Sequence, residues 1–131
     1  MFQFKTFVRY SETDQMGVVY YANYFVYFEA ARTALLKSEG KPYGEFEKRG
    51  IFLPVIEAYC KYNSPIFYED EIIVNCWISE VKNTSFKFEY EILKKDKPVA
   101  RGYTRHCCTD KNLKPIKIPD DLKNIIEKYK R

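Results

Sequence analysis

The sequence predicts an α+β domain in which five antiparallel strands surround one long helix. Two features of its pattern predict this class. Apolar and aromatic residues follow a helical spacing over one long segment, residues 23–38. Before and after that segment, apolar and polar residues alternate with the period of two that is typical of strands. The order of one strand, a long helix, a short helix and four strands favours a sheet with a helix packed against it.

The first expected strand runs from about Phe2 to Tyr10. Alternate residues of this segment form one face that can point to a core: Phe2, Phe4, Thr6, Val8 and Tyr10. Residues 11–21 follow neither period, so they are expected to form a loop.

The long helix is expected from Asn23 to about Ser38, with Asn23 as its N-cap and Gly40 at its C′ position. Pro42 opens a short second helix that ends near Gly50. Most positions around the long helix are apolar or aromatic, which predicts that it is buried over most of its circumference. Its only polar side consists of Glu29, Arg32, Thr33 and Lys37, of which Glu29 and Arg32 have the spacing of an ion pair.

The four later strands are expected over residues 56–62, 72–78, 86–92 and 99–109. Residues 86–92, "FKFEYEI", alternate most cleanly. Turns are expected at "VKNTS" (81–85) and "KKDKP" (94–98), and a short amphipathic helix after Pro119. The whole chain, residues 1–131, is expected to be a single domain. An open five-stranded sheet has unpaired edges, so edge pairing of two copies is expected to give a homodimer.

Composition excludes several classes of function. Hydrophobic residues make up 46% of the chain, enough for a sizeable core, and the net charge of +4 is too small and scattered for a nucleic-acid surface. No segment approaches the roughly 20 apolar residues that span a membrane, and the N-terminus does not read as a signal peptide. The four cysteines lack CxxC spacing and there is one histidine, so no metal site is expected and reduced thiols in the cytoplasm are favoured.

Residues 8–33, "VRYSETDQMGVVYYANYFVYFEAART", resemble the hotdog-fold acyl-CoA thioesterases of the 4-hydroxybenzoyl-CoA thioesterase type, and most closely the Tol-Pal-associated branch. The family pattern of an aromatic residue, x-x-T-D-x-x-G-V-V, N-Y and E-x-A-R matches Tyr10, 13–14, 17–19, 23–24 and 29–32. Later stretches, "NTSFKFEYEI" and "LKPIKIPDDL", are also similar. The resemblance implies a hotdog fold and hydrolysis of acyl-CoA to free CoA and a carboxylic acid. It implies no metal or organic cofactor, and a homodimer that can pair into a homotetramer.

The chemistry of residues 10–24 follows from a carboxylate placed before a helix N-terminus. Unpaired backbone N–H groups around Tyr21 and Ala22 could polarise a thioester carbonyl, because a helix N-terminus carries partial positive charge. Gly17 allows a sharp turn close to a ligand. Asp14 could then act as a nucleophile or as a general base that activates water, and the sequence does not decide between these roles. The alternative for Asp14 is a loop acid that caps a turn.

The resemblance assigns further site residues. It places Tyr10 in the site with Asp14, and it puts Tyr21 where some relatives carry a histidine. A phenol titrates near 10, so Tyr21 could donate a hydrogen bond but would be a poor base at neutral pH. The expected catalytic residues are therefore Asp14, Tyr21 and Tyr10, and the expected substrate-binding residues are Gly17, Val19, Ala22, Asn23 and Ser85.

Other polar residues carry weaker expectations. Glu12 is expected to face solvent, and the single histidine, His106, to be a hydrogen-bonded strand residue outside the site. Four cations are candidates for the CoA phosphates without a ranking: Lys61, Lys87, Arg101 and Arg105. The acyl group's length and aromaticity remain open, and so does the alternative of a non-catalytic protein that binds acyl-CoA or an acyl-carrier protein.

Overall fold

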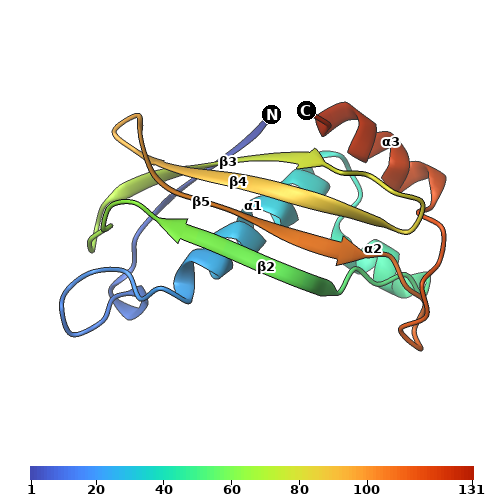
Figure 1. Cartoon of the computed structure of the whole chain (residues 1–131), viewed down its shortest axis with the longest axis horizontal. Coiled ribbons are helices and arrows are strands. Elements are labelled where there is room, and N and C mark those ends of the chain that lie inside the picture. The colour runs from blue at the N-terminus through green and yellow to red at the C-terminus, as the bar shows by residue number, and fades with distance from the viewer.

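Five antiparallel strands form one sheet in the order β1-β3-β4-β5-β2, and the long helix α1 lies across one of its faces (Figure 1). The computed structural model describes all 131 residues. Its elements are β1 (Phe2–Phe7), the 3-10 helix η1 (Tyr10–Glu12), α1 (Asn23–Ser38), α2 (Tyr43–Lys48), β2 (Val55–Tyr62), β3 (Glu71–Ser79), β4 (Ser85–Lys94), β5 (Lys97–Cys107) and α3 (Asp120–Tyr129). The predicted α+β class and its five-stranded antiparallel sheet are confirmed. No helix is long and apolar enough to cross a membrane.

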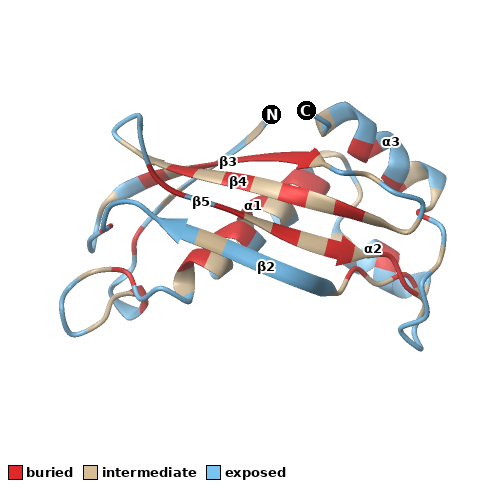
Figure 2. Cartoon of the chain, in the orientation of Figure 1, coloured by how far each residue is buried: buried red, intermediate tan, exposed pale blue.

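The alternating pattern of the strands determines which face of the sheet is buried. Along β4, buried and half-buried residues alternate, and the buried ones are Phe86, Phe88, Tyr90 and Ile92. Figure 2 shows the same alternation as red and tan bands on β4 and β5. The buried face points toward α1, so the alternating apolar residues form the core between sheet and helix.

A close contact between Phe28 and the sheet fixes where α1 lies. The Phe28 ring stacks on the Tyr90 ring with centroids 4.2 Å apart and planes only 5° from parallel. Gly102 is the cross-strand neighbour of Tyr90 on β5. A Cβ at Gly102 would lie 2.7 Å from Phe28 Cε2 and would also overlap the backbone oxygen of Tyr59. The absence of a side chain at Gly102 therefore lets the helix approach the sheet at this point.

Two local expectations are wrong. The first strand ends at Phe7, before Tyr10. Its register with β3 ends at the pair Phe7–Glu71, and beyond that pair only Val8 bonds to the turn before β3, through Asp70 O and the Glu69 amide. Tyr10 consequently belongs to η1, and it is 77% exposed. In the single chain α1 is also less buried than predicted, with Val26 53% exposed, because the sheet covers only one side of the helix.

The two edges of the sheet differ in how well they are covered. Beside the β1 edge, the C-terminal residues add a short parallel bridge to β3, with the Arg131 amide donating to Ile78 O at 2.9 Å. At the other edge, every residue of β2 except Cys60 is exposed, and Figure 2 shows this strand in pale blue apart from one tan band. The exposed β2 residues include Val55, Ile56, Tyr59 and Tyr62. The β2 edge is therefore the unprotected one.

Gly102→Ala is expected to destabilise the fold by about 1–3 kcal/mol or more, because the added methyl group must displace Phe28 or the β2 backbone. Chemical denaturation would measure the loss. Gly44→Ala in α2 is the matched control: nothing lies within 4 Å of its Cβ position, so its stability should be unchanged or slightly higher. Equal effects of the two substitutions would contradict the role given to Gly102.

Candidate active site

Asp14 begins a tight turn in the loop between η1 and α1. The Gly17 amide donates to Asp14 O at 3.0 Å, and the Asp14 amide donates to Val18 O at 2.9 Å. Gly17 has φ of +80°, a conformation that glycine adopts without strain. One carboxylate oxygen of Asp14, Oδ1, accepts the Met16 amide at 2.8 Å. The second oxygen has no partner in the chain, so Asp14 caps the turn and still has one oxygen free.

A cavity of about 350 Å³ lies beside this turn. It brings together three predicted site residues, Asp14, Val19 and Tyr21, where the loop approaches the end of β2. We name it the Asp14 cavity and define it by its lining residues: Asp14, Val18, Val19, Tyr21, Tyr24, Tyr62, Asn63, Ser64 and Pro65.

The start of α1 contributes free backbone N–H groups next to this cavity. The amides of Asn23, Tyr24 and Phe25 donate to the carbonyls three residues earlier, at 2.9–3.3 Å. The amides of Tyr21 and Ala22 donate to no acceptor in the chain. Two unpaired donors thus precede the first turn of the helix, as expected for a helix N-terminus.

Asn23 is not the N-cap that was predicted. Ala22 holds the N-cap position with helical torsion angles (φ −67°, ψ −25°), so the chain already turns one residue earlier. The Asn23 side chain instead points back to the loop, and its Nδ2 donates to Glu12 O at 2.9 Å. Asn23 therefore anchors the loop to the helix.

Glu12 is the main support of the loop, and the expectation that it faces solvent is wrong. It is 9% exposed. Its Oε1 accepts the Arg9 amide at 2.8 Å and the Tyr27 hydroxyl at 2.9 Å, and its Oε2 accepts Arg9 Nη1 at 3.1 Å. Its backbone oxygen also accepts the Tyr20 amide at 2.9 Å. Burial, with the added effect of the Glu12 hydrogen bond, raises the pKa of Tyr27, so this phenol remains a donor.

The remaining predicted residues lie outside the Asp14 cavity. Tyr10 is exposed and packs edge-to-face on Tyr68, with ring centroids 5.6 Å apart. Ser85 begins β4 opposite Cys107, whereas Tyr62 pairs with Ala100 at the other end of the sheet. Within one chain the structure does not bring Ser85 to Asp14. Ser64 supplies a hydroxyl-bearing residue at the cavity that sequence reasoning missed, although "NSP" after a strand is a recognisable turn signal.

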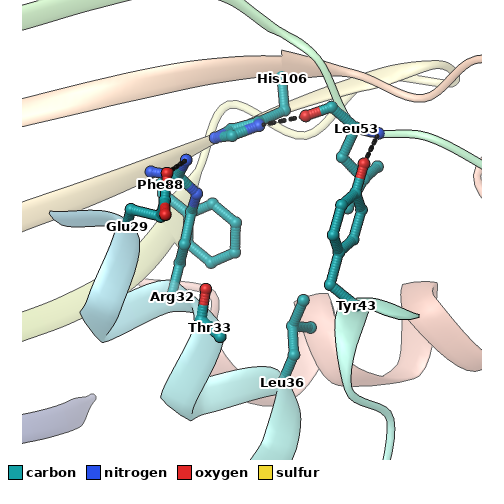
Figure 3. Close-up of a pocket in the computed structure, with 8 residues that line it drawn as sticks. All are labelled: Glu29, Arg32, Thr33, Leu36, Tyr43, Leu53, Phe88 and His106. Atoms are coloured by element: carbon teal, nitrogen blue, oxygen red, sulfur yellow. Dashed lines mark hydrogen bonds and ion pairs between the residues drawn. The ribbon is translucent and has the colours of Figure 1, made fainter. Parts of the chain in front are cut away.

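A second cavity, of about 240 Å³, lies between α1, α2 and the sheet (Figure 3). We name it the Arg32 cavity. Its lining residues are Glu29, Arg32, Thr33, Leu36, Tyr43, Leu53, Phe88 and His106. Figure 3 shows the Arg32 side chain rising from α1 toward His106 on the sheet. The predicted Glu29–Arg32 pair is present, with Glu29 Oε2 3.8 Å from Arg32 Nη2.

His106 is a satisfied strand residue, as predicted. Its Nδ1 lies 2.9 Å from Leu53 O, a pure acceptor, so Nδ1 carries the hydrogen. Nε2 then accepts from Thr104 Oγ1 at 2.8 Å, and Thr104 in turn lies 2.6 Å from the Tyr90 hydroxyl. Burial lowers the pKa of His106 to about 4. Because both ring nitrogens are engaged and the ring is neutral, His106 has no free lone pair to act as a base.

Comparisons of the sequence and of the fold with known proteins both find thioesterases. Residues 8–126 match the family described as the thioesterase-like superfamily. A 1,4-dihydroxy-2-naphthoyl-CoA hydrolase of Nostoc punctiforme is 26% identical over 132 residues, 99% of this chain and 89% of that protein. A hypothetical protein from Aquifex aeolicus has a solved structure with a TM-score of 0.93 and 36% identity, over 96% of this chain and 99% of that chain. The DHNA-CoA thioesterase from Staphylococcus aureus gives a TM-score of 0.90 and 31% identity, over 96% and 88% of the two chains.

Glu12→Gln is expected to lower the free energy of unfolding by about 1–3 kcal/mol, because an amide cannot accept from all three donors that now bind the carboxylate. Denaturant unfolding would measure this. Glu127→Gln, an exposed acid on α3, is the control and should change stability by less than about 0.5 kcal/mol. A Glu12→Gln protein as stable as the control would show that the loop does not depend on this carboxylate.

Proposed function

The chain belongs to the thioesterase-like superfamily and is a thioester hydrolase, and we propose that Asp14 carries out its chemistry on acyl-CoA at the Asp14 cavity. One observation carries the proposal. The cavity is lined by a carboxylate with one free oxygen and by Tyr21, the first of two consecutive residues at the start of α1 whose amides are free. Hydrolysis of a thioester needs both parts, a group that attacks or activates water and donors for the oxyanion.

Two routes fit this geometry. In the first, the Asp14 carboxylate attacks the carbonyl carbon, CoA leaves as a thiolate that takes up a proton, and water hydrolyses the resulting anhydride. In the second, Asp14 accepts a proton from water as that water attacks, and the CoA thiolate leaves from the tetrahedral intermediate. In either route the Tyr21 and Ala22 amides donate to the oxyanion, and such a donor typically contributes about 3 kcal/mol to transition-state stabilisation.

The other expected site residues form two groups, those at or beside the Asp14 cavity and those away from it. Gly17 shapes the turn, Val19 forms an apolar wall, and Asn23 holds the loop, so all three support the site through its shape. Tyr21 lines the cavity, and its backbone carbonyl accepts the Tyr62 hydroxyl at 2.9 Å. Tyr10 and Ser85 lie away from the cavity, and the proposed chemistry does not require either of them within one chain.

The CoA phosphates need cations that are not already neutralised. Arg105 is paired with Glu57 and Glu80, and Lys87 with Glu80. Lys61 and Arg101 have no carboxylate within 4 Å, and they face each other across β2 and β5 near the Tyr62 end of the sheet. We therefore favour Lys61 and Arg101 among the four candidate cations for binding phosphate.

A homodimer formed through β2 is part of the proposal. The strand exposes its backbone edge and a row of apolar side chains along its length. Antiparallel pairing of two β2 strands would satisfy the free backbone groups and cover those side chains. It would also set the Val55 end of one copy beside the Tyr62 end, and hence the Asp14 cavity, of the other. Assembly of dimers into a homotetramer, a cytoplasmic location and membership of the Tol-Pal-associated branch stay predictions.

One contact favours a second candidate function, that of a non-catalytic acyl-CoA or acyl-carrier-protein binder. The bond from the Met16 amide to Asp14 Oδ1 gives the carboxylate a purely structural task. If that task were its only one, the chain would bind thioesters without cleaving them.

Asp14→Asn separates these two functions, because the amide oxygen of Asn can still accept the Met16 hydrogen bond while the free anionic oxygen is lost. The proposal predicts a fall in kcat of about 100-fold or more, with little change in KM. Thiol release from butyryl-, lauroyl- and benzoyl-CoA measures this. Glu127→Gln serves as the control, and turnover by Asp14→Asn at the wild-type rate would remove Asp14 from the mechanism.

Ala58→Lys tests the dimer. Ala58 is exposed near the middle of β2, where it lines an open cavity beside α1, so two lysines would lie near each other across an antiparallel β2 pair. Light scattering after size exclusion should give twice the chain mass for the wild type and a shift toward one chain mass for the variant. Leu113→Lys, at an exposed apolar residue in a turn, should remain dimeric. A wild type with the mass of one chain would contradict the dimer.

A further inference from the structure

Arg32 is a largely buried cation that faces two cavities. Its side chain is only 17% exposed. It lines the Arg32 cavity on one side, shown in Figure 3. On the other side it lines a more open cavity of about 260 Å³ beside β2, together with Phe25, Val26 and Val55. A guanidinium has five N–H donors, so a buried arginine normally has several oxygen partners.

The chain neutralises Arg32 poorly. Glu29 is the only carboxylate within 4 Å, its nearest oxygen is 3.8 Å away, and its own side chain is 69% exposed. An exposed pair of this kind contributes little. The one hydrogen bond of Arg32, from Nη1 to the Tyr90 hydroxyl, is long at 3.4 Å. Tyr90, Thr104 and His106 are neutral and are hydrogen-bonded to one another. The guanidinium thus keeps free donors toward the cavities, in surroundings that contain no buried negative charge.

We propose that the Arg32 cavity binds a carboxylate attached to a compact apolar or aromatic body. The cation would take the carboxylate in two parallel hydrogen bonds, which suits the planar guanidinium. Phe88, Leu36 and Leu53 form apolar walls for the body of the ligand. A volume of about 240 Å³ is below the usual range of pockets for drug-sized ligands, so the part that enters is small.

Glu29 can give way to such a ligand. Its side chain makes no hydrogen bond in the chain, so nothing holds it next to Arg32 other than the weak ion pair. A ligand carboxylate would replace one negative partner with another at shorter range, and Glu29 would turn into water. Glu29 therefore competes with the ligand, and removing its charge should tighten binding.

The carboxylate could have either of two sources, and this part rests on the proposed function. It could be the far end of the acyl group of a bound thioester, or it could be the free acid that hydrolysis releases. Both present the same group to Arg32, and they differ in whether the cavity affects the choice of substrate.

Titration calorimetry with sodium benzoate tests the site directly. We expect saturable binding to the wild type, a loss of at least tenfold in affinity for Arg32→Met, and a several-fold gain for Glu29→Gln. Arg32→Lys keeps the charge without the paired donors and should bind with intermediate affinity. Lys37→Met, which removes an exposed cation from the same helix, should bind like the wild type. Circular dichroism melting would establish that each variant is folded.

Absence of benzoate binding to the wild type would overturn the site. So would equal affinities of the wild type and a folded Arg32→Met protein.

A matched pair of thioesters separates the two sources. Adipoyl-CoA and hexanoyl-CoA have the same six-carbon acyl chain and differ in a terminal carboxylate. If the carboxylate belongs to the acyl group, adipoyl-CoA should have the higher kcat/KM, and Arg32→Met should bring the ratio of the two kcat/KM values close to one. If it belongs to the free acid, both thioesters should react alike, and benzoate should inhibit the wild type more strongly than Arg32→Met.

Failure of the wild type to hydrolyse any thioester would overturn the proposed function alone, because benzoate binding reports on the Arg32 cavity without turnover.

Discussion

The buried carboxylate of Glu12 is the interaction on which the candidate site most depends. The loop between β1 and α1 contains no regular element except η1, so its shape must come from specific hydrogen bonds. Three donors converge on the Glu12 side chain and two more on its backbone oxygen, and they come from Arg9, Tyr20, Asn23 and Tyr27. Residues on both sides of Asp14 are thereby tied to one point, and that point is tied to α1.

The position of α1 is set independently, by its contact with the sheet. Phe28 stacks on Tyr90 over the gap that Gly102 leaves, which fixes the helix against β4 and β5. Tyr27, one residue before Phe28, carries the hydroxyl that holds Glu12. The contact that positions the helix and the contact that positions the loop are therefore adjacent in sequence. One turn further along the helix, Arg32 donates to the hydroxyl of the same Tyr90 and borders a separate cavity.

Periodicity was sufficient to predict the sheet and the helix, because a period of two or of 3.6 is a local property of the sequence. The Thr13-Asp14-x-x-Gly17 pattern was sufficient to predict a turn with a carboxylate at its start. The roles of Glu12 and Asn23 could not be predicted in the same way. The Glu12 side chain accepts a hydrogen bond from Tyr27, fifteen residues later in the chain. The Asn23 side chain donates to a carbonyl eleven residues earlier instead of capping the helix. Ser64 reaches the cavity only because β2 ends beside the loop, which depends on the strand order.

A crystal structure with a non-hydrolysable acyl-CoA analogue, in which a methylene group replaces the thioester sulfur, would test the central claim most directly. The account predicts that the ketone oxygen lies within hydrogen-bonding distance of the Tyr21 or Ala22 amide. It also predicts that the free carboxylate oxygen of Asp14 faces the ketone carbon, while the other still accepts the Met16 amide. A ketone bound away from these amides, or an Asp14 carboxylate turned toward solvent, would contradict it.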